Sequence, residues 1–169
     1  GINRGNGAWA RELTSVPASA AGIRQIVERI KGAGGYERIV TDEYRTVNGK
    51  DVLIARTRQS GVETRKDQYT YYENGKRKTH LSSSGLLTEY EYDERNRRTV
   101  VRETSPDGRI AETRSSYAPL NVRPHSPEDA ATVGIADDDG SVDSGTPRVE
   151  TRYEDGVPVS KTLRFIALD

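Results

Sequence analysis

The sequence has no cysteine and no methionine, and it contains one phenylalanine and one tryptophan. The lack of cysteine excludes disulfide bonds and thiolate metal sites. Only 33% of the residues are hydrophobic, so any core must be thin, and nine tyrosines supply most of the aromatic area. Because no apolar run is long enough to cross a bilayer, we expect a protein that does not span a membrane.

The charges balance, with 26 basic and 26 acidic residues, so the chain gives no reason to expect nucleic-acid binding. One stretch departs from this balance. Residues 118–147 contain four prolines and six acidic residues, namely Glu128, Asp129, Asp137, Asp138, Asp139 and Asp143. A long irregular segment of this kind is typical of a functional or a disordered loop. A calcium loop would need ligands where Ile135 and Thr146 stand, so we expect no metal site.

The N-terminal part predicts an arm followed by a helix. Residues 1–13 are interpreted as a flexible arm, and residues 18–31 as an amphipathic helix. The helix is predicted from four aliphatic residues at positions i, i+3, i+4 and i+7, which are Ile23, Ile26, Val27 and Ile30. Gly32 stands where a helix commonly ends.

From Tyr36 onward the hydrophobic period changes to two, which indicates β-strands. Asn48-Gly49 is a strong hairpin signal. Further turn signals follow at residues 60–61, 74–75, 84–85, 95–96, 107–108 and 155–156. This rhythm predicts a mainly β fold, a curled antiparallel meander of about nine strands packed around the N-terminal helix. Residues 14–169 would then form a single β-repeat domain, with the acidic loop 118–147 as an insertion.

Residues 85–117 resemble the tyrosine–aspartate (Rhs/YD) repeats of bacterial surface and secreted proteins. The matching positions are Gly85, Tyr90, Tyr92, Asp93 and Arg97. Asn96 stands where the family has glycine, and asparagine also tolerates the left-handed conformation. The segment 71–76 is similar to type-2 MORN repeats as well. The resemblance implies β-hairpin repeats that serve as a shell, scaffold or binding surface, and it implies no catalytic residues.

The tyrosines are the best candidates for a site. Tyr69, Tyr71, Tyr90 and Tyr92 stand in two pairs that recur after 21 residues. Flat rings with polar tips suit binding of a protein or glycan partner. The same residues could instead fill the core of a sheet that has few other large apolar side chains, and the sequence leaves both possibilities open.

The sequence offers little for catalysis. His80 and His125 are the only histidines, and no nucleophile motif accompanies them. We therefore expect a non-enzymatic interaction or scaffold module without cofactors. Gly1 suggests an expression remnant or the start of a mature segment, and an exported or cell-surface protein is expected. The alternative is a periplasmic carrier that binds an amphiphilic or lipid ligand between the helix and the curled sheet.

Overall fold

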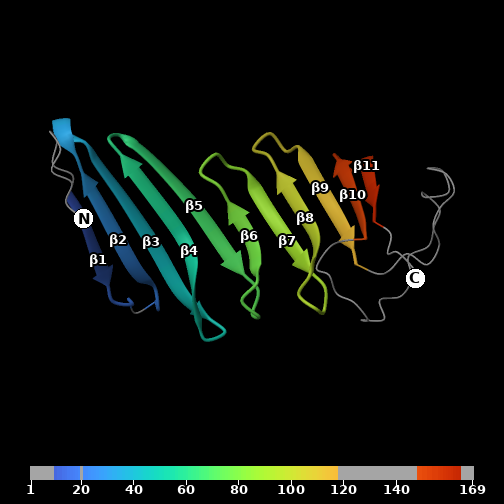
Figure 1. Cartoon of the computed structure of the whole chain (residues 1–169), viewed down its shortest axis with the longest axis horizontal. Helices are drawn as coiled ribbons and strands as arrows, with labels where there is room; N and C mark the ends of the chain where they lie inside the picture. Colours follow the sequence, from blue (N-terminus) through green and yellow to red (C-terminus); the bar gives the residue numbers. More distant parts are fainter. Residues whose placement is uncertain (1–9, 20, 118–147, 165–169) are drawn as a thin grey trace. The chain divides into compact units, whose positions relative to one another are not determined.

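The computed structural model describes residues 10–19, 21–117 and 148–164 of the chain. The fold is mainly β, with eleven strands among these residues, and strands that pair do so antiparallel (Figure 1). The chain divides into two compact units, Gly1–Leu87 and Thr88–Asp169. None of the helical structure in the described residues is long and apolar enough to cross a membrane.

The first unit is a meander of six strands in which each strand pairs with the next. The strands are β1 (Ala10–Val16), β2 (Arg24–Lys31), β3 (Glu37–Val47), β4 (Lys50–Ser60), β5 (Glu63–Tyr71) and β6 (Arg77–Leu81). A short 3-10 turn, η1 (Ala33–Gly35), joins β2 to β3. At the β3–β4 hairpin, Asn48 and Gly49 both have positive φ angles of 50° and 72°. This confirms the turn predicted from Asn-Gly.

The second unit continues the same pattern with five strands. They are β7 (Leu87–Tyr92), β8 (Arg98–Thr104), β9 (Ile110–Ser116), β10 (Val149–Glu154) and β11 (Val157–Leu163). β8 pairs with β9, β9 with β10 and β10 with β11. The predicted acidic loop 118–147 falls between β9 and β10 and lies outside the described residues.

The predicted helix over residues 18–31 is wrong, because Arg24–Lys31 form β2. Gly22 lies inside the predicted helix but has a φ of +74°, which ends any right-handed helix there. The N–H of Ser19 bonds to the carbonyl of Ile23 at 2.9 Å, and the N–H of Gly22 bonds to the carbonyl of Ser19 at 2.8 Å. These bonds close a turn between β1 and β2.

The predicted count of about nine strands is too low because of the same error. The nine predicted strands correspond to β3–β11, and β1 and β2 are the two additional ones. With β2 in the place of the predicted helix, the described residues contain no N-terminal helix around which the sheet could pack. Residues 10–13 of the predicted arm belong to β1, and residues 1–9 lie outside the described part. The division into an arm and a single domain over 14–169 stays a prediction.

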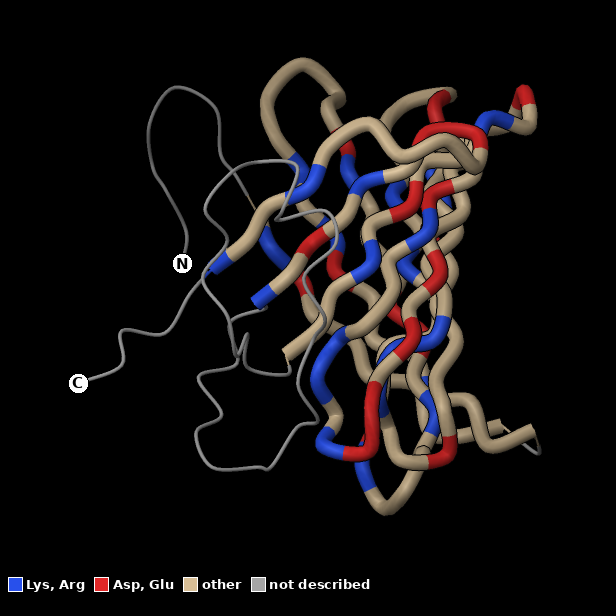
Figure 2. Tube along the Cα trace, turned by 90° about the vertical axis from the view of Figure 1, so that its right-hand side faces the viewer, with Lys and Arg blue, Asp and Glu red and all other residues tan. Residues whose placement is uncertain are grey.

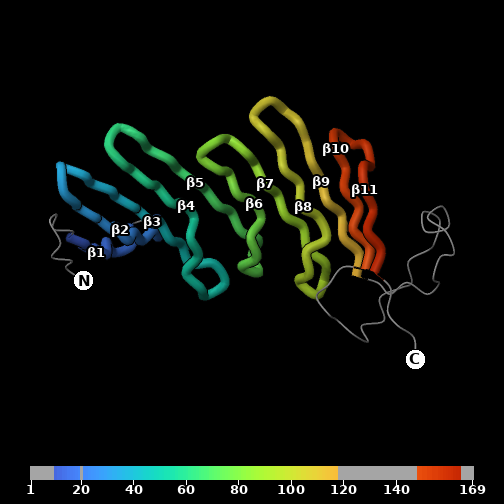
Figure 3. Tube along the Cα trace, turned by 45° about the horizontal axis from the view of Figure 1, so that its top comes forward, coloured from blue at the N-terminus to red at the C-terminus, as the bar shows by residue number. Residues whose placement is uncertain are grey.

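The tube reverses direction at tight turns between neighbouring strands (Figure 3). Five of the turns share one hydrogen-bond pattern. They span residues 19–23, 72–76, 82–86, 93–97 and 105–109. In each turn the first N–H bonds to the fifth carbonyl, and the fourth N–H bonds to the first carbonyl. The fourth residue always has a positive φ, between 60° and 87°, and is Gly22, Gly75, Gly85, Asn96 or Gly108. The predicted left-handed role of Asn96 is therefore confirmed.

Little of the described chain is buried. The buried residues are Ala55, Thr88, Glu112 and Val149, and no large side chain is fully enclosed. Val62, Leu13 and Val157 are 106%, 64% and 61% exposed. Charged residues of both signs follow one another along the strands (Figure 2). Within each unit, cross-strand pairs therefore stabilise the strands more than a central core does.

Candidate functional site

One face of the first unit carries two rows of residues that lie opposite one another across β2, β3, β4 and β5. The first row is Ile26, Asp42, Arg56 and Asp67, and the second is Glu28, Val40, Arg58 and Arg65. Residues directly opposite in an antiparallel pair share a face. We call this side the ladder face.

The centre of the ladder face is a bidentate pair between Asp42 and Arg56. Arg56 donates from Nε to Oδ1 and from Nη2 to Oδ2, each at 2.7 Å. The two side chains are 15% and 35% exposed. The hydrogen bonds to Asp42 raise the pKa of Arg56 further, so this guanidinium remains charged. Burial and the Asp42 carboxylate also raise the pKa of Tyr44, whose hydroxyl lies 3.5 Å from Asp42 Oδ2.

Asp67 joins three neighbouring segments of the first unit. Its Oδ2 lies 2.9 Å from Arg58 Nη1 on β4, and its Oδ1 lies 3.3 Å from His80 Nε2 on β6. Oδ1 also accepts the Ser83 N–H at 3.2 Å. Burial raises the pKa of Asp67, but the hydrogen bonds from His80, Ser83 and Arg58 outweigh it, so the pKa lies below its usual value. The carboxylate is thus held ionised.

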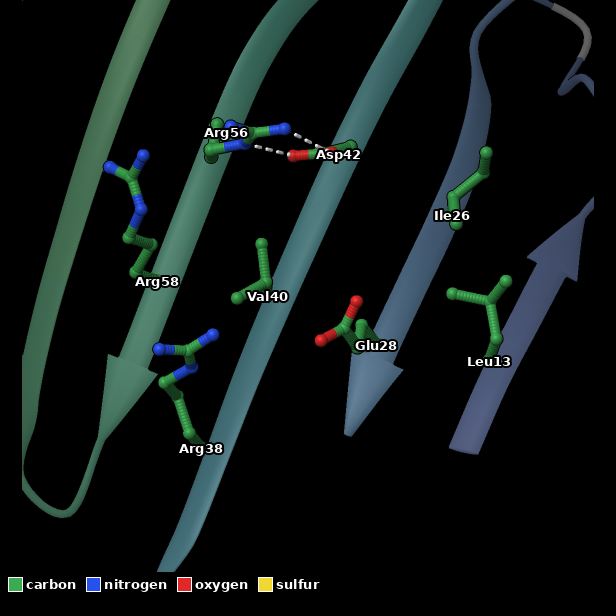
Figure 4. Close-up of a pocket in the computed structure, with 8 residues that line it drawn as sticks. All are labelled: Leu13, Ile26, Glu28, Arg38, Val40, Asp42, Arg56 and Arg58. Carbon is green, nitrogen blue, oxygen red and sulfur yellow. Dashed lines mark hydrogen bonds and ion pairs between the residues drawn. The ribbon is translucent and has the colours of Figure 1, made fainter. Parts of the chain in front are cut away.

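A shallow pocket of about 230 Å³ opens on the ladder face (Figure 4). Its lining is Leu13, Ile26, Glu28, Arg38, Val40, Asp42, Arg56 and Arg58. The two acids are neutralised, since Asp42 bonds to Arg56 and Glu28 lies 3.0 Å from Arg11. Arg38 is exposed and has no ion pair within the described ranges. The pocket therefore offers one available guanidinium next to three aliphatic side chains.

The predicted tyrosines are half-buried, and arginines cover two of them. Tyr69 stacks on His80 with ring centres 4.7 Å apart, and the Arg77 guanidinium lies 4.5 Å from the Tyr69 centroid. Arg98 lies 4.6 Å from the Tyr90 centroid. The two arginines, like the two tyrosines, are 21 residues apart, so the repeat includes its stacking partner. Sequence reasoning missed these arginines, although their spacing was visible.

Tyr71 and Tyr92 differ from that pair. The Tyr71 hydroxyl donates to the Leu53 carbonyl at 2.6 Å, so its polar tip is engaged by the backbone of β4. Tyr92 is half-buried on β7. Tyr69 and Tyr71 lie in the first unit, and Tyr90 and Tyr92 in the second. A binding role for these four tyrosines stays a prediction.

The second unit has its own charged cluster around Glu112. This glutamate is 8% exposed, lies opposite Arg102 and accepts hydrogen bonds from Arg102 Nε at 2.7 Å and from Arg114 Nε. The Arg114 guanidinium covers Tyr153 at 4.9 Å. Burial raises the pKa of Glu112, but the bonds from Arg114 and Arg102 outweigh it, so the net pKa is lowered. Arg102 and Glu112 thus form a cross-strand acid–base pair.

The aspartate of the Tyr-x-Tyr-Asp motif caps a turn. Asp93 Oδ1 accepts the N–H groups of Arg95 and Arg97, each at 2.9 Å, and Oδ2 accepts from Arg97 Nε at 2.7 Å. The Arg97 guanidinium then lies 4.6 Å from the Tyr117 centroid. Burial raises the pKa of Asp93, but the Arg97 and Arg95 bonds lower it below its usual value. The motif residues Asp93 and Arg97 therefore have a structural role.

In the described part of the chain, no group of three potential ligands is placed to hold a metal ion. His80 belongs to the Asp67 and Tyr69 contacts of the ladder face. His125 and the acidic residues Asp137, Asp138 and Asp139 lie outside the described residues. The expectations of no metal and no cofactor stay predictions.

A family model described as RHS Repeat matches residues 71–110. The match runs from the last residue of β5 to the first residue of β9 and confirms the predicted Rhs/YD resemblance there. No curated protein and no solved structure matches the chain. The likeness to type-2 MORN repeats stays a prediction. RHS repeats are typical of extracellular or cell-surface proteins, and the match suggests a repeat-based interaction or scaffold module.

Proposed function

We propose that this chain is a non-enzymatic interaction module of an exported or cell-surface protein, and that its ladder face binds a protein partner. The partner presents a carboxylate next to an aliphatic group. The observation that carries this proposal is Arg38, a guanidinium without an acidic partner in the described chain, beside Val40 in the pocket.

The chemistry of the pocket favours a carboxylate. A guanidinium binds carboxylates through parallel hydrogen bonds, and such charge-assisted bonds are stronger than neutral ones. The aliphatic residues Leu13, Ile26 and Val40 supply an apolar surface for the carbon atoms next to that group. Polypeptides carry acidic and aliphatic side chains side by side, whereas most sugars lack aliphatic branches. A protein partner therefore suits the pocket better than a glycan.

The size of the pocket supports recognition of a side chain. Its volume of about 230 Å³ is below the roughly 300–1,000 Å³ typical of pockets that enclose small molecules. One acidic residue of a partner could enter it while neighbouring partner residues lie on the strands. The exposure of the sheet makes such a contact accessible, because few described side chains are buried.

The protonation of the carboxylates supports a non-enzymatic role. A general acid that works near neutral pH needs a raised pKa. Asp67, Asp93 and Glu112 have lowered pKa values, and each is engaged by arginine or backbone donors. These carboxylates are built into the sheet as structural anions.

The alternative of a periplasmic carrier for an amphiphilic ligand lacks the cavity on which it was based. It required a cavity between an N-terminal helix and a curled sheet, but residues 24–31 form β2. The pocket on the ladder face is instead lined by side chains of four strands, β1 to β4.

The test is a titration of the ¹⁵N-labelled chain with short acetylated, amidated peptides followed by NMR. One peptide places glutamate beside leucine, and its control replaces the glutamate with glutamine. We expect the acidic peptide to shift Arg38, Val40 and their ladder-face neighbours, and the control to shift them less. Binding of acidic glycans in place of acidic peptides, or shifts confined to the opposite face, would contradict the proposal.

The cellular location needs a separate test. Fractionation of cells that produce the full-length gene product, with an antibody against this segment, should place it in the exported or surface fraction. Recovery only from the cytosol would contradict export but leave the binding proposal standing.

A further inference from the structure

β1 has the properties of an edge strand that is open to pairing. All seven of its residues, Ala10–Val16, are exposed. Its one neighbour among the described strands is β2. An edge strand presents a row of backbone N–H and C=O groups, which forms a template for another strand. The side chains of β1 include the exposed aliphatic residues Leu13 and Val16, at 64% and 42%.

β1 lacks three devices that commonly protect an edge strand, although it carries the charged residues Arg11 and Glu12. Natural edges are blunted by proline, lysine or a bulge. β1 contains no proline or lysine, and its register with β2 is regular from Ala10↔Lys31 to Val16↔Gln25. β11 is an instructive contrast, because it carries Pro158 and Lys161 and pairs with β10 through an irregular register. Thus β11 is protected in three ways and β1 in none of them.

We infer that β1 is a dimerisation edge, on which a second copy of this chain pairs its own β1 antiparallel about a two-fold axis at Leu13. Leu13 is the central residue of the strand, so this register uses all seven positions. It places Leu13 against Leu13, Glu12 against Thr14, Arg11 against Ser15 and Ala10 against Val16 of the other copy. A two-fold contact of this kind closes on itself and does not propagate into a fibre.

The Leu13 register is self-complementary in charge and polarity. No charged residue meets a like charge, and each charged side chain faces a hydroxyl. An axis at Glu12 would set two glutamates against each other, which is unfavourable in directly opposed positions. An axis at Thr14 would place Glu12 against Val16 of the other copy. The central leucine pair is favoured because it joins the two most apolar parts of the edges.

The surface next to Leu13 strengthens the same register. Leu13 and Ile26 both line the ladder-face pocket. A two-fold axis normal to the sheet keeps the ladder faces of both copies on the same side, so the two Leu13 side chains meet across the axis, and Ile26 of each copy lies one strand further from it on β2. This contact removes apolar area from water at the point where β1 is most exposed. The inference goes beyond the proposed function, because it concerns the strand edge and leaves the Arg38 guanidinium available.

Site-specific cross-linking tests the register directly, because the chain contains no cysteine of its own. In this register Leu13→Cys places two thiols opposite each other, since opposed Cβ atoms lie about 4.5–5.5 Å apart. Mild oxidation or a short bis-maleimide should convert this variant into a covalent dimer. Ser15→Cys alone should cross-link poorly, but a mixture of Ser15→Cys and Arg11→Cys should form the mixed dimer.

Two controls make the result decisive. Val62→Cys is fully exposed in a turn and reports random collisions.

Light scattering of the untreated chain should give a dimer mass, and Leu13→Lys should give a monomer with an unchanged circular dichroism spectrum. A monomeric parent chain, equal cross-linking of the Leu13→Cys and Val62→Cys variants, or preferential cross-linking of Ser15→Cys alone would overturn the inference. If Leu13→Lys fails to fold, the cysteine series still decides between the registers.

Discussion

Asp42 and Arg56 lie directly opposite each other on β3 and β4 and share two hydrogen bonds of 2.7 Å each. Both side chains are partly shielded from solvent, at 15% and 35% exposure. Glu63 and Arg65 also form a short contact of 2.6 Å, but they are 60% and 63% exposed. Both pairs join an acidic to a basic side chain, so a comparison of their contributions to stability isolates the effect of shielding from solvent.

A double-mutant cycle should show this difference. With Asp42→Ala, Arg56→Ala and the double variant, we expect a coupling free energy of about 1 kcal/mol, because shielded bidentate pairs are favoured over exposed ones. The same cycle at Glu63 and Arg65 should give roughly 0–0.5 kcal/mol. Urea unfolding measures both. Equal couplings at the two sites would show that shielding from solvent adds nothing to the strength of the Asp42–Arg56 pair.

Stability should fall in acid because three carboxylates have lowered pKa values. A group with a lowered pKa in the folded state stabilises the fold above its usual pKa, 4.5 for Glu112 and 3.8 for Asp67 and Asp93. This stabilisation is lost as the pH falls through the usual value and then through the folded one. We therefore expect the free energy of unfolding to decrease progressively below about pH 5.

Glu112→Gln isolates one part of that acid dependence. It removes the carboxylate that accepts from Arg102 and Arg114, so we expect a loss of about 1–2 kcal/mol at neutral pH. The variant should also lose stability less steeply in acid than the parent chain. Glu73→Gln, at an exposed turn position, is the control and should leave the acid profile unchanged. Parallel profiles for the parent and Glu112→Gln would contradict the assignment.

The turn at residues 93–97 makes a prediction about Asn96. Its φ of 60° is tolerated by asparagine and glycine but is strained for β-branched residues such as valine. Glycine also tolerates this φ, so Asn96→Gly should cost less than Asn96→Val, for which we expect a loss of about 1–2 kcal/mol. Thermal unfolding of the two variants side by side gives the comparison. A harmless Asn96→Val would mean that this turn does not require the left-handed conformation.

Much of the strand pattern was predictable because turns leave local signals. Asn48-Gly49, Gly75, Gly85 and Gly108 mark positions that need a positive φ, and such positions can be recognised from the residue type alone. The nine strands from Tyr36 onward therefore follow from the spacing of these residues. The Asp93 position of the Rhs/YD motif was also visible, and the structure adds that it caps the turn.

The helix error has a physical origin in the exposure of the sheet. On a strand with one buried face, aliphatic residues alternate, but Ile26 and Val27 are neighbours and are both half-buried. When neither face is deeply buried, apolar residues occur on both, and their spacing can imitate a helical stripe. Gly22 was the signal that could have prevented the error, since it lies four residues before Ile26 with the same role as Gly75.

The ladder face could not be predicted from the sequence, for a different reason. Asp42 and Arg56 are 14 residues apart, and their pairing depends on the register of β3 and β4. That register shifts between Glu43 and Tyr44, so counting outward from the Asn48-Gly49 turn gives the wrong partners. The pocket also depends on strand register, because its lining residues Leu13, Arg38 and Arg58 come from three different strands.

Tyr71 tests how far the tyrosines contribute to the sheet itself. Its hydroxyl bonds to the Leu53 carbonyl at 2.6 Å, so Tyr71→Phe should cost about 1 kcal/mol. Tyr69→Phe keeps the ring that stacks on His80 and should be nearly neutral. Chemical denaturation compares the two. A larger loss for Tyr69→Phe than for Tyr71→Phe would reverse this assignment.

In the proposed function, the ladder face binds an acidic partner through Arg38. Arg29 provides a matched control, because it is also exposed on a strand of the first unit and lies opposite Ile39 on the other face. The direct measurement is the affinity of the glutamate–leucine peptide for Arg38→Glu and Arg29→Glu. We expect affinity to fall roughly tenfold or more for Arg38→Glu, which corresponds to about 1.4 kcal/mol, and almost not at all for Arg29→Glu. Equal losses, or a larger loss for Arg29→Glu, would contradict the proposed function.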